Sequence, residues 1–131
     1  TAVFFLCNSP ATAGTNGGPI PGPWIFLNAP LVTVYYLPGT TGWEPTFSQR
    51  STMLWNPQIQ TSDGSFGVGP TGFGFNVVGT PDIPIVIEAG TDLAAQSWVP
   101  QQSCTLTNGL IHFNDAQWAN FPSRYYRVRS P

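Results

Sequence analysis

The sequence predicts an all-β protein built around an antiparallel β-sandwich. Three observations lead to this prediction. The 131 residues include 14 glycines and 14 prolines, which interrupt the chain too often for a helix of about ten residues. The apolar runs between them are short and rich in β-branched and aromatic residues. Several runs also alternate between apolar and polar residues, as strands with one buried face do.

Taken in order along the chain, the apolar runs define ten expected strands. They lie at 2–7, 24–28, 31–37, 52–55, 73–78, 84–89, 97–99, 103–107, 109–114 and 124–129. Asn108-Gly109 separates the eighth run from the ninth, and this dipeptide predicts a hairpin between the two. Short helical turns are expected at 42–47, 92–96 and 115–119.

Two polar segments divide the chain. Residues 8–23 have the Pro/Gly composition of a long loop, and a second break falls at 56–65. We therefore expect an N-terminal β part over 1–57 and a C-terminal sandwich of immunoglobulin or fibronectin size over 64–131. The N-terminal part has too few strands to bury both faces of a sheet alone, so we expect it to pack on, or complete, a neighbour.

Charge is scarce. Only 8% of residues are charged, lysine is absent, and the net charge is −2. An average soluble domain is about one quarter charged. Such a chain has no basic face for nucleic acid, and it has no run of 18 apolar residues to span a membrane. The composition favours an extracellular or cell-surface β module.

The two cysteines, Cys7 and Cys104, lie near opposite ends of the chain. In an oxidising compartment they would form a disulfide, and closing so long a loop would stabilise the fold by about 4–5 kcal/mol in the chain-entropy picture. The alternative is a pair of buried free thiols.

The first strand is a candidate for self-assembly. Ala2, Val3, Phe4, Phe5 and Leu6 form a continuous apolar run with no charge to protect a sheet edge. The strand is either an ordinary core strand or one that adds to the sheet of another copy. Head-to-tail addition of this kind makes open filaments when the rotation does not close.

Exposed tryptophans are the candidates for ligand stacking. Of the five tryptophans, Trp24 and Trp43 lie beside Pro/Gly loops, where an exposed ring could stack on a sugar. The competing interpretation is that tryptophans fill the core, which we expect for Trp98 and Trp118.

We predict no catalytic residues and no cofactor. The single histidine, His112, would need a nucleophile and an orienting Asp115 or Asp92, and no nucleophile-elbow motif is present. The sequence lacks a set of His and Cys ligands for a metal, and its carboxylates are isolated. The alternative of a structural Ca²⁺ ion bound by backbone carbonyl oxygens of loops is not decided by the sequence.

Two stretches resemble known proteins. Residues 34–43 (Val-Tyr-Tyr-Leu-Pro-Gly-Thr-Thr-Gly-Trp), followed by Phe47 and 54–57 (Leu-Trp-Asn-Pro), resemble the end of BspA-like leucine-rich-repeat arrays of large bacterial surface proteins. Residues 2–10 resemble the strand and turn that open such a repeat. From Phe73 onward, with 85–89 (Ile-Val-Ile-Glu-Ala) and 124–128 (Arg-Tyr-Tyr-Arg-Val), the chain resembles a β-sandwich module that ends many secreted bacterial proteins. The resemblance implies a surface-exposed, non-catalytic part and transfers no functional residue.

Together these observations suggest a non-enzymatic, extracellular structural or adhesive module. We expect it to assemble as a filament or appendage subunit through β-strand contacts, with copies of itself or with neighbouring domains of a larger surface protein. The alternative is a carbohydrate-binding module that uses exposed tryptophans to bind glycans.

Overall fold

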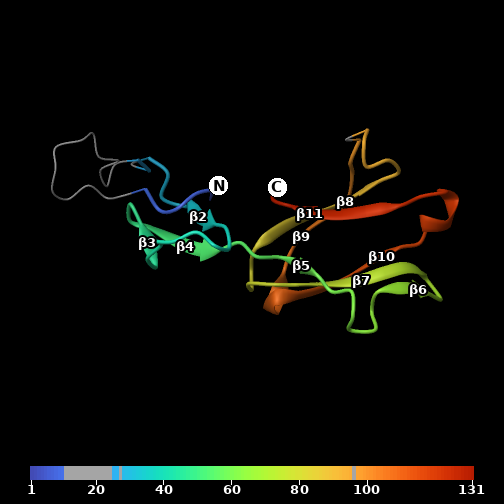
Figure 1. Cartoon of the computed structure of the whole chain (residues 1–131). Coiled ribbons are helices and arrows are strands. Elements are labelled where there is room, and N and C mark those ends of the chain that lie inside the picture. Colours follow the sequence, from blue (N-terminus) through green and yellow to red (C-terminus); the bar gives the residue numbers. More distant parts are fainter. Residues whose placement is uncertain (11–24, 27, 96) are drawn as a thin grey trace. The chain divides into compact units, whose positions relative to one another are not determined.

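A computed structural model describes residues 1–10, 25, 26, 28–95 and 97–131, and in these residues the protein is almost entirely β-structure (Figure 1). Its helical segments are two single turns of 3₁₀-helix, η1 (Thr107–Gly109) and η2 (Trp118–Asn120). The all-β prediction is confirmed. The chain divides into two compact units, Thr1–Asn56 and Pro57–Pro131.

The first unit contains one four-stranded sheet in the order β1-β2-β4-β3. Its strands are β1 (Ala2–Phe5), β2 (Thr33–Tyr36), β3 (Thr46–Phe47) and β4 (Arg50–Leu54). β1, β2 and β4 run parallel, and only β3 is antiparallel to its neighbour. The sequence did not predict this parallel order, because alternation shows which face of a strand is buried but not its direction.

The parallel register places similar side chains side by side. Val3 pairs with Val34, and this face carries the core of the unit. On the opposite face Phe4 stacks on Tyr35, with ring centroids 4.9 Å apart, close to the spacing between neighbouring strands. The core cluster comprises Phe26, Val32, Val34 and Phe47, with Val3, Phe5, Ala29 and Trp43 packed against it.

A hairpin closes one end of this sheet. Ser48 and Gln49 both have positive φ (47° and 63°), as a two-residue turn of the type I′ class requires, and they connect β3 to β4. Arg50, at the start of β4, donates to the carbonyl oxygens of Ala29 (2.9 Å) and Phe26 (2.8 Å). The guanidinium therefore ties the turn before β2 to the hairpin.

The second unit is a sandwich of two antiparallel sheets. One sheet has the order β10-β7-β5, with β6 also paired to β7, and the other has the order β11-β8-β9. The two layers are visible in Figure 1. The strands are β5 (Gln58–Ile59), β6 (Gly67–Gly69), β7 (Gly72–Val78), β8 (Pro84–Gly90), β9 (Val99–Thr105), β10 (Leu110–Asp115) and β11 (Tyr125–Arg129).

Alternate residues of these strands form the core between the two sheets. Phe75, Val77, Ile85 and Ile87 are fully buried, as the period of two predicts. Tyr126 of β11 stacks on Phe73 of β7 with centroids 5.3 Å apart, which joins one sheet to the other. Complete burial of a side chain of this size stabilises the fold by about 1.5–3 kcal/mol.

The predicted Asn-Gly hairpin is wrong. Asn108 and Gly109 do form a tight turn with positive φ (57° and 77°), but the strands on either side belong to different sheets. β9 pairs with β8, whereas β10 pairs with β7, so the turn carries the chain from one layer to the other. The Asn-Gly dipeptide correctly predicts a tight turn, but a turn does not decide which strands pair.

Other differences concern strand ends. The expected runs at 97–99 and 103–107 each overlap one strand, β9 (Val99–Thr105), and Pro100 lies within it at the edge of its sheet. Short strands β3, β5 and β6 were not predicted, because two or three residues carry no periodic signal. The expected strand at 24–28 forms a turn at its described residues 25, 26 and 28.

We predict that Arg50→Met destabilises the first unit by about 1.5–3 kcal/mol, because two backbone carbonyls lose a charged donor. Amide hydrogen exchange of β2 measures this change. Arg50→Lys is the matched control, since it keeps the charge but lacks the planar fork that reaches both oxygens. If Arg50→Lys exchanges as slowly as the wild type, the two-carbonyl account is incorrect.

Candidate functional site

The outer edge of β1 is the part of the first unit that sequence reasoning selected for assembly. The carbonyl oxygen of Thr1 accepts from the Thr33 N–H (3.2 Å), so Thr1 faces β2. Because successive residues of a strand point their backbone groups to opposite sides, Val3 and Phe5 also face β2. Ala2 and Phe4 then direct their N–H and C=O groups to the outer edge, where no described strand pairs with β1.

The side chains of β1 hold the strand in its own sheet. Phe4 contacts Tyr35 and, edge to face, Trp55 at 6.0 Å. Phe5 packs against Trp43 and Phe47 on the other face. Within the predicted segment, only Leu6 is a large side chain left exposed, at 77%. β1 is thus paired on one side within its own chain and has one unpaired backbone edge among the described residues.

The two candidate stacking tryptophans fare differently. Trp43 lies against the rings of Phe5, Tyr36 and Phe47, and its ring is parallel to that of Tyr36 at 5.3 Å. Its Nε1 is buried and has no hydrogen-bond partner among the described residues. Trp43 therefore acts as a packing residue of the first unit. Trp24 lies outside the described residues.

The predicted disulfide is not formed. Cys7 and Cys104 are free thiols and belong to different units. Cys7 is exposed just after β1, whereas Cys104 pairs with Ile85 in β8 and is half-buried. Burial raises the pKa of the Cys104 thiol. The disulfide prediction rests on redox compartment and loop length, and neither brings the two Cα atoms within the limit of about 7 Å that a disulfide requires.

Tryptophan and arginine side chains cover the outer face of the β8 sheet. Glu88 is only 4% exposed and pairs with Arg127 (2.7 Å) and Arg129 (2.6 Å), which project from β11. The Arg127 guanidinium lies 4.4 Å above the Trp98 ring. The hydrogen bond from Arg129, opposed by burial but aided by Arg127, lowers the pKa of Glu88.

A second ionic cluster closes one end of the sandwich. Asp115 accepts from Arg124 (2.9 Å), from the Tyr126 hydroxyl (3.0 Å) and from the Gln117 backbone N–H (2.9 Å). Burial acts to raise the pKa of Asp115, but these donors outweigh it and the net direction is downward. Burial and the neighbouring carboxylate raise the pKa of Tyr126 to about 12.

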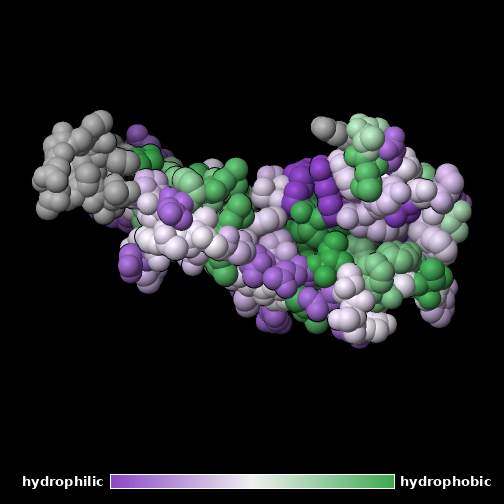
Figure 2. All heavy atoms as spheres, viewed as in Figure 1, coloured by the Kyte–Doolittle hydropathy of each residue, from purple (hydrophilic) through white to green (hydrophobic). Residues whose placement is uncertain are grey.

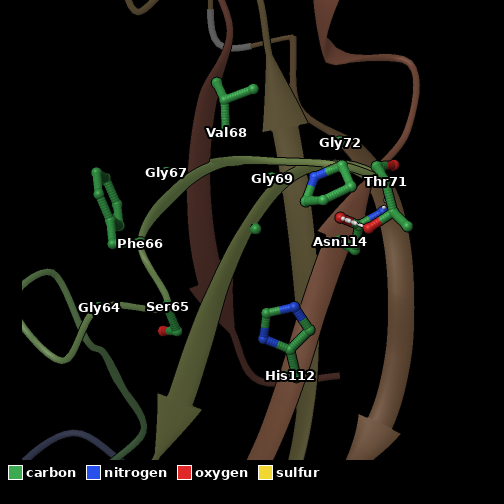
Figure 3. Close-up of a pocket in the computed structure, with 12 residues that line it drawn as sticks. Gly64, Ser65, Phe66, Gly67, Val68, Gly69, Thr71, Gly72, His112 and Asn114 are labelled. Atoms are coloured by element: carbon green, nitrogen blue, oxygen red, sulfur yellow. Dashed lines mark hydrogen bonds between the residues drawn. The ribbon is translucent and has the colours of Figure 1, made fainter.

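A concave site lies on the outer face of the β10-β7 sheet (Figure 3). His112 of β10 shares a hydrogen bond with Asn76 of β7 (Nδ1 to Oδ1, 2.9 Å). Asn76 in turn donates to Asp63 (2.9 Å), and the Ser65 hydroxyl also donates to Asp63 (2.6 Å). These bonds lower the pKa of Asp63, with the Ser65 hydroxyl the largest cause.

This arrangement differs from the Ser-His-Asp device considered from the sequence. Asp115 faces the core, opposite Phe73, whereas His112 lies on the outer face opposite Asn76. The Ser65 hydroxyl donates to Asp63 rather than to His112. Among the described residues, no group of three or more His, Cys, Asp or Glu side chains is placed to hold a metal ion.

The signal for this site was present in the sequence but was not used. Glycines recur at 67, 69, 72 and 74, and they leave the outer face of β6 and of the first half of β7 without side chains. Glycine within a strand can mark a close approach by a ligand or another backbone.

Comparison with known proteins gives no match: no family model, no curated protein and no solved structure is similar to this chain. None of the helices in the described part of the chain is long and apolar enough to cross a membrane.

We predict that acid destabilises the second unit partly through Glu88. Because its pKa is lower in the folded state, the unfolded chain takes up the proton more readily. The contribution is therefore complete above the unfolded pKa of about 4.5 and is lost as pH falls through the folded pKa. Glu88→Gln should lower the free energy of unfolding by about 1–2 kcal/mol at pH 7. This is less than the loss of one partner of a fully buried ion pair, because both arginines stay partly hydrated.

Urea unfolding followed by the NMR signal of the Trp98 indole N–H at pH 7 and pH 3 measures this effect. The difference in the free energy of unfolding between the wild type and Glu88→Gln should be smaller at pH 3 than at pH 7. Asp92→Asn, an exposed change that keeps an oxygen acceptor for the Ala94 N–H, is the control and should follow the wild type. Equal pH dependence in wild type and Glu88→Gln would contradict this account.

Proposed function

We propose that this protein is a non-enzymatic extracellular structural or adhesive module that assembles through β-strand contacts, as a filament or appendage subunit. The observation that carries the proposal is the outer edge of β1. Ala2 and Phe4 direct backbone donors and acceptors outward there, and no charged residue lies in the strand to oppose pairing.

The two edge strands of the first unit's sheet, β1 and β3, differ in length and direction, and this difference supports the proposal. At one end the β3–β4 hairpin turns back and ends the parallel order, and β3 is only two residues long. At the other end β1 offers a four-residue edge in the parallel direction. One edge accepts a strand and the other does not, which favours directional addition over a symmetric sheet-to-sheet contact.

The second unit contains a second uncharged edge, in which Pro100 lacks one backbone donor. β9 is seven residues long, carries no charge, and lies at the edge of its sheet. An edge on each unit would let copies join head to tail, and the low charge lets them approach without strong repulsion. Most of the surface visible in Figure 2 has neither strongly polar nor strongly apolar colour.

The extracellular assignment rests on composition and on the resemblance to bacterial surface proteins. A surface with so few ionised groups must stay soluble through Thr, Ser, Asn, Gln and backbone. The carbohydrate alternative based on Trp24 and Trp43 has less support, because Trp43 packs against three aromatic rings of its own unit.

A single proline substitution in β1 tests whether its outer edge mediates assembly. Ala2→Pro removes the N–H that faces outward and leaves the β1–β2 hydrogen bonds intact, since the residues that bond β2 are Thr1, Val3 and Phe5. We predict concentration-dependent assembly of the wild type in sedimentation velocity and its loss in Ala2→Pro.

Ala2→Ser keeps the outward N–H at nearly the same size and is the matched control, so it should assemble as the wild type does. Hydrogen exchange of β2 should be the same in both variants, which shows that the sheet itself persists. Assembly of Ala2→Pro at the wild-type level, or a wild type that stays monomeric at high concentration, would refute the proposal.

A further inference from the structure

The outer face of the β10-β7 sheet has a pocket of about 300 Å³ that is separate from the β1 edge. Glycines of β6 and β7 form much of its wall, and His112 and Asn114 of β10 border it (Figure 3). Phe66 and Val68 point away from His112, since Val68 is opposite Phe73 on the core side of the sheet. Apart from His112, the lining residues have no ionisable side chain, so the pocket suits a neutral ligand.

The tautomer of His112 follows from its neighbours. The Asp63 carboxylate can only accept, so the Asn76 group that meets it is the amide nitrogen. The Asn76 oxygen therefore faces His112 Nδ1, which must carry the hydrogen. In the neutral ring this leaves Nε2 as a hydrogen-bond acceptor, and His112 is exposed on the pocket side.

The hydroxyl groups of the pocket already donate their hydrogens to acceptors within the protein. Thr71 donates its hydroxyl to the Asn114 oxygen (3.1 Å), and Asn114 returns a bond from its nitrogen to the Thr71 carbonyl (3.0 Å). Ser65 donates to Asp63. Thr71 Oγ1 and His112 Nε2 can thus accept from a ligand, and a ligand with two hydrogen-bond donors matches them.

The glycines keep the pocket open for reasons that differ by position. A Cβ on Gly74 would lie 3.1 Å from the His112 ring, which is closer than an ordinary van der Waals contact, so a side chain there would press against the ring. A Cβ on Gly69 would meet only the Gly72 carbonyl oxygen at 3.8 Å, so packing does not require glycine there. A side chain at Gly69 would instead take up space in the pocket.

We propose that this pocket binds a single sugar ring, whose hydroxyls donate to His112 Nε2 and Thr71 Oγ1 while the ring lies against the glycine backbone. A sugar is neutral, rich in hydroxyl donors and flat enough for a side-chain-free sheet face. The proposal uses neither tryptophan of the earlier carbohydrate hypothesis and is independent of strand-mediated assembly.

Titration of the full-length protein with methyl glycosides of glucose, galactose and mannose, followed by NMR shifts of the backbone amides and the His112 ring, tests the proposal. At least one glycoside should give saturable shifts at Gly69, Gly72 and His112, with a dissociation constant of about 1–10 mM, as expected for a small open site. Titration with methylammonium chloride asks whether a cationic donor binds instead.

Two variants remove the site in different ways. His112→Phe takes away the acceptor and should weaken binding about five- to tenfold, and Gly69→Val fills the pocket and should abolish binding. Leu110→Ala, which changes an exposed side chain on the same face outside the pocket lining, is the control and should bind as the wild type does.

The absence of saturable shifts with all three glycosides would overturn the proposal. So would shifts with methylammonium alone, or glycoside binding that both site variants leave unchanged. Comparing the spectra of the variants with that of the wild type verifies that each retains the sandwich, so that lost binding is assigned to the pocket.

Discussion

Scarcity of charge is the constraint on which the rest of this structure depends. Most of the few ionised groups bond to partners within their own unit. In the second unit, Glu88 with Arg127 and Arg129 covers one sheet, and Asp115 with Arg124 closes the end of the sandwich. In the first unit, Arg50 binds carbonyl oxygens. β1 and β9 therefore lie at sheet edges with no charged side chain of their own, and charge is a common protection against edge-to-edge pairing.

The cluster of Glu88 with Arg127 and Arg129 also explains how a small sandwich can bury a central strand on both faces. In β8 the core side carries Ile85 and Ile87, and the outer side carries Val86 and Glu88. A lone buried carboxylate would be unfavourable, but two guanidinium groups and the Trp98 ring form a lid that satisfies it. The lid depends on β11, so the last strand of the chain completes the sheet and also neutralises its buried charge.

The sequence allowed the β class and the apolar character of β1 to be predicted, because each depends on local composition. It did not allow strand pairing to be predicted. Asn108 and Gly109 form the expected tight turn, yet this turn crosses between sheets, because β9 pairs with β8 and β10 pairs with β7, and pairing with strands outside the turn is not encoded in the turn itself. The pocket was also missed: the bond between Asn76 and His112 joins residues 36 positions apart and has no local signature.

The central claim is that the outward backbone groups of β1 join another strand. Amide hydrogen exchange of β1 over a concentration series tests it most directly, because the strand contains its own internal comparison. We predict that the Phe4 amide gains protection as the protein is concentrated, whereas Val3 and Phe5, which already bond β2, change little. Exchange at Phe4 that stays fast at every concentration would contradict the account.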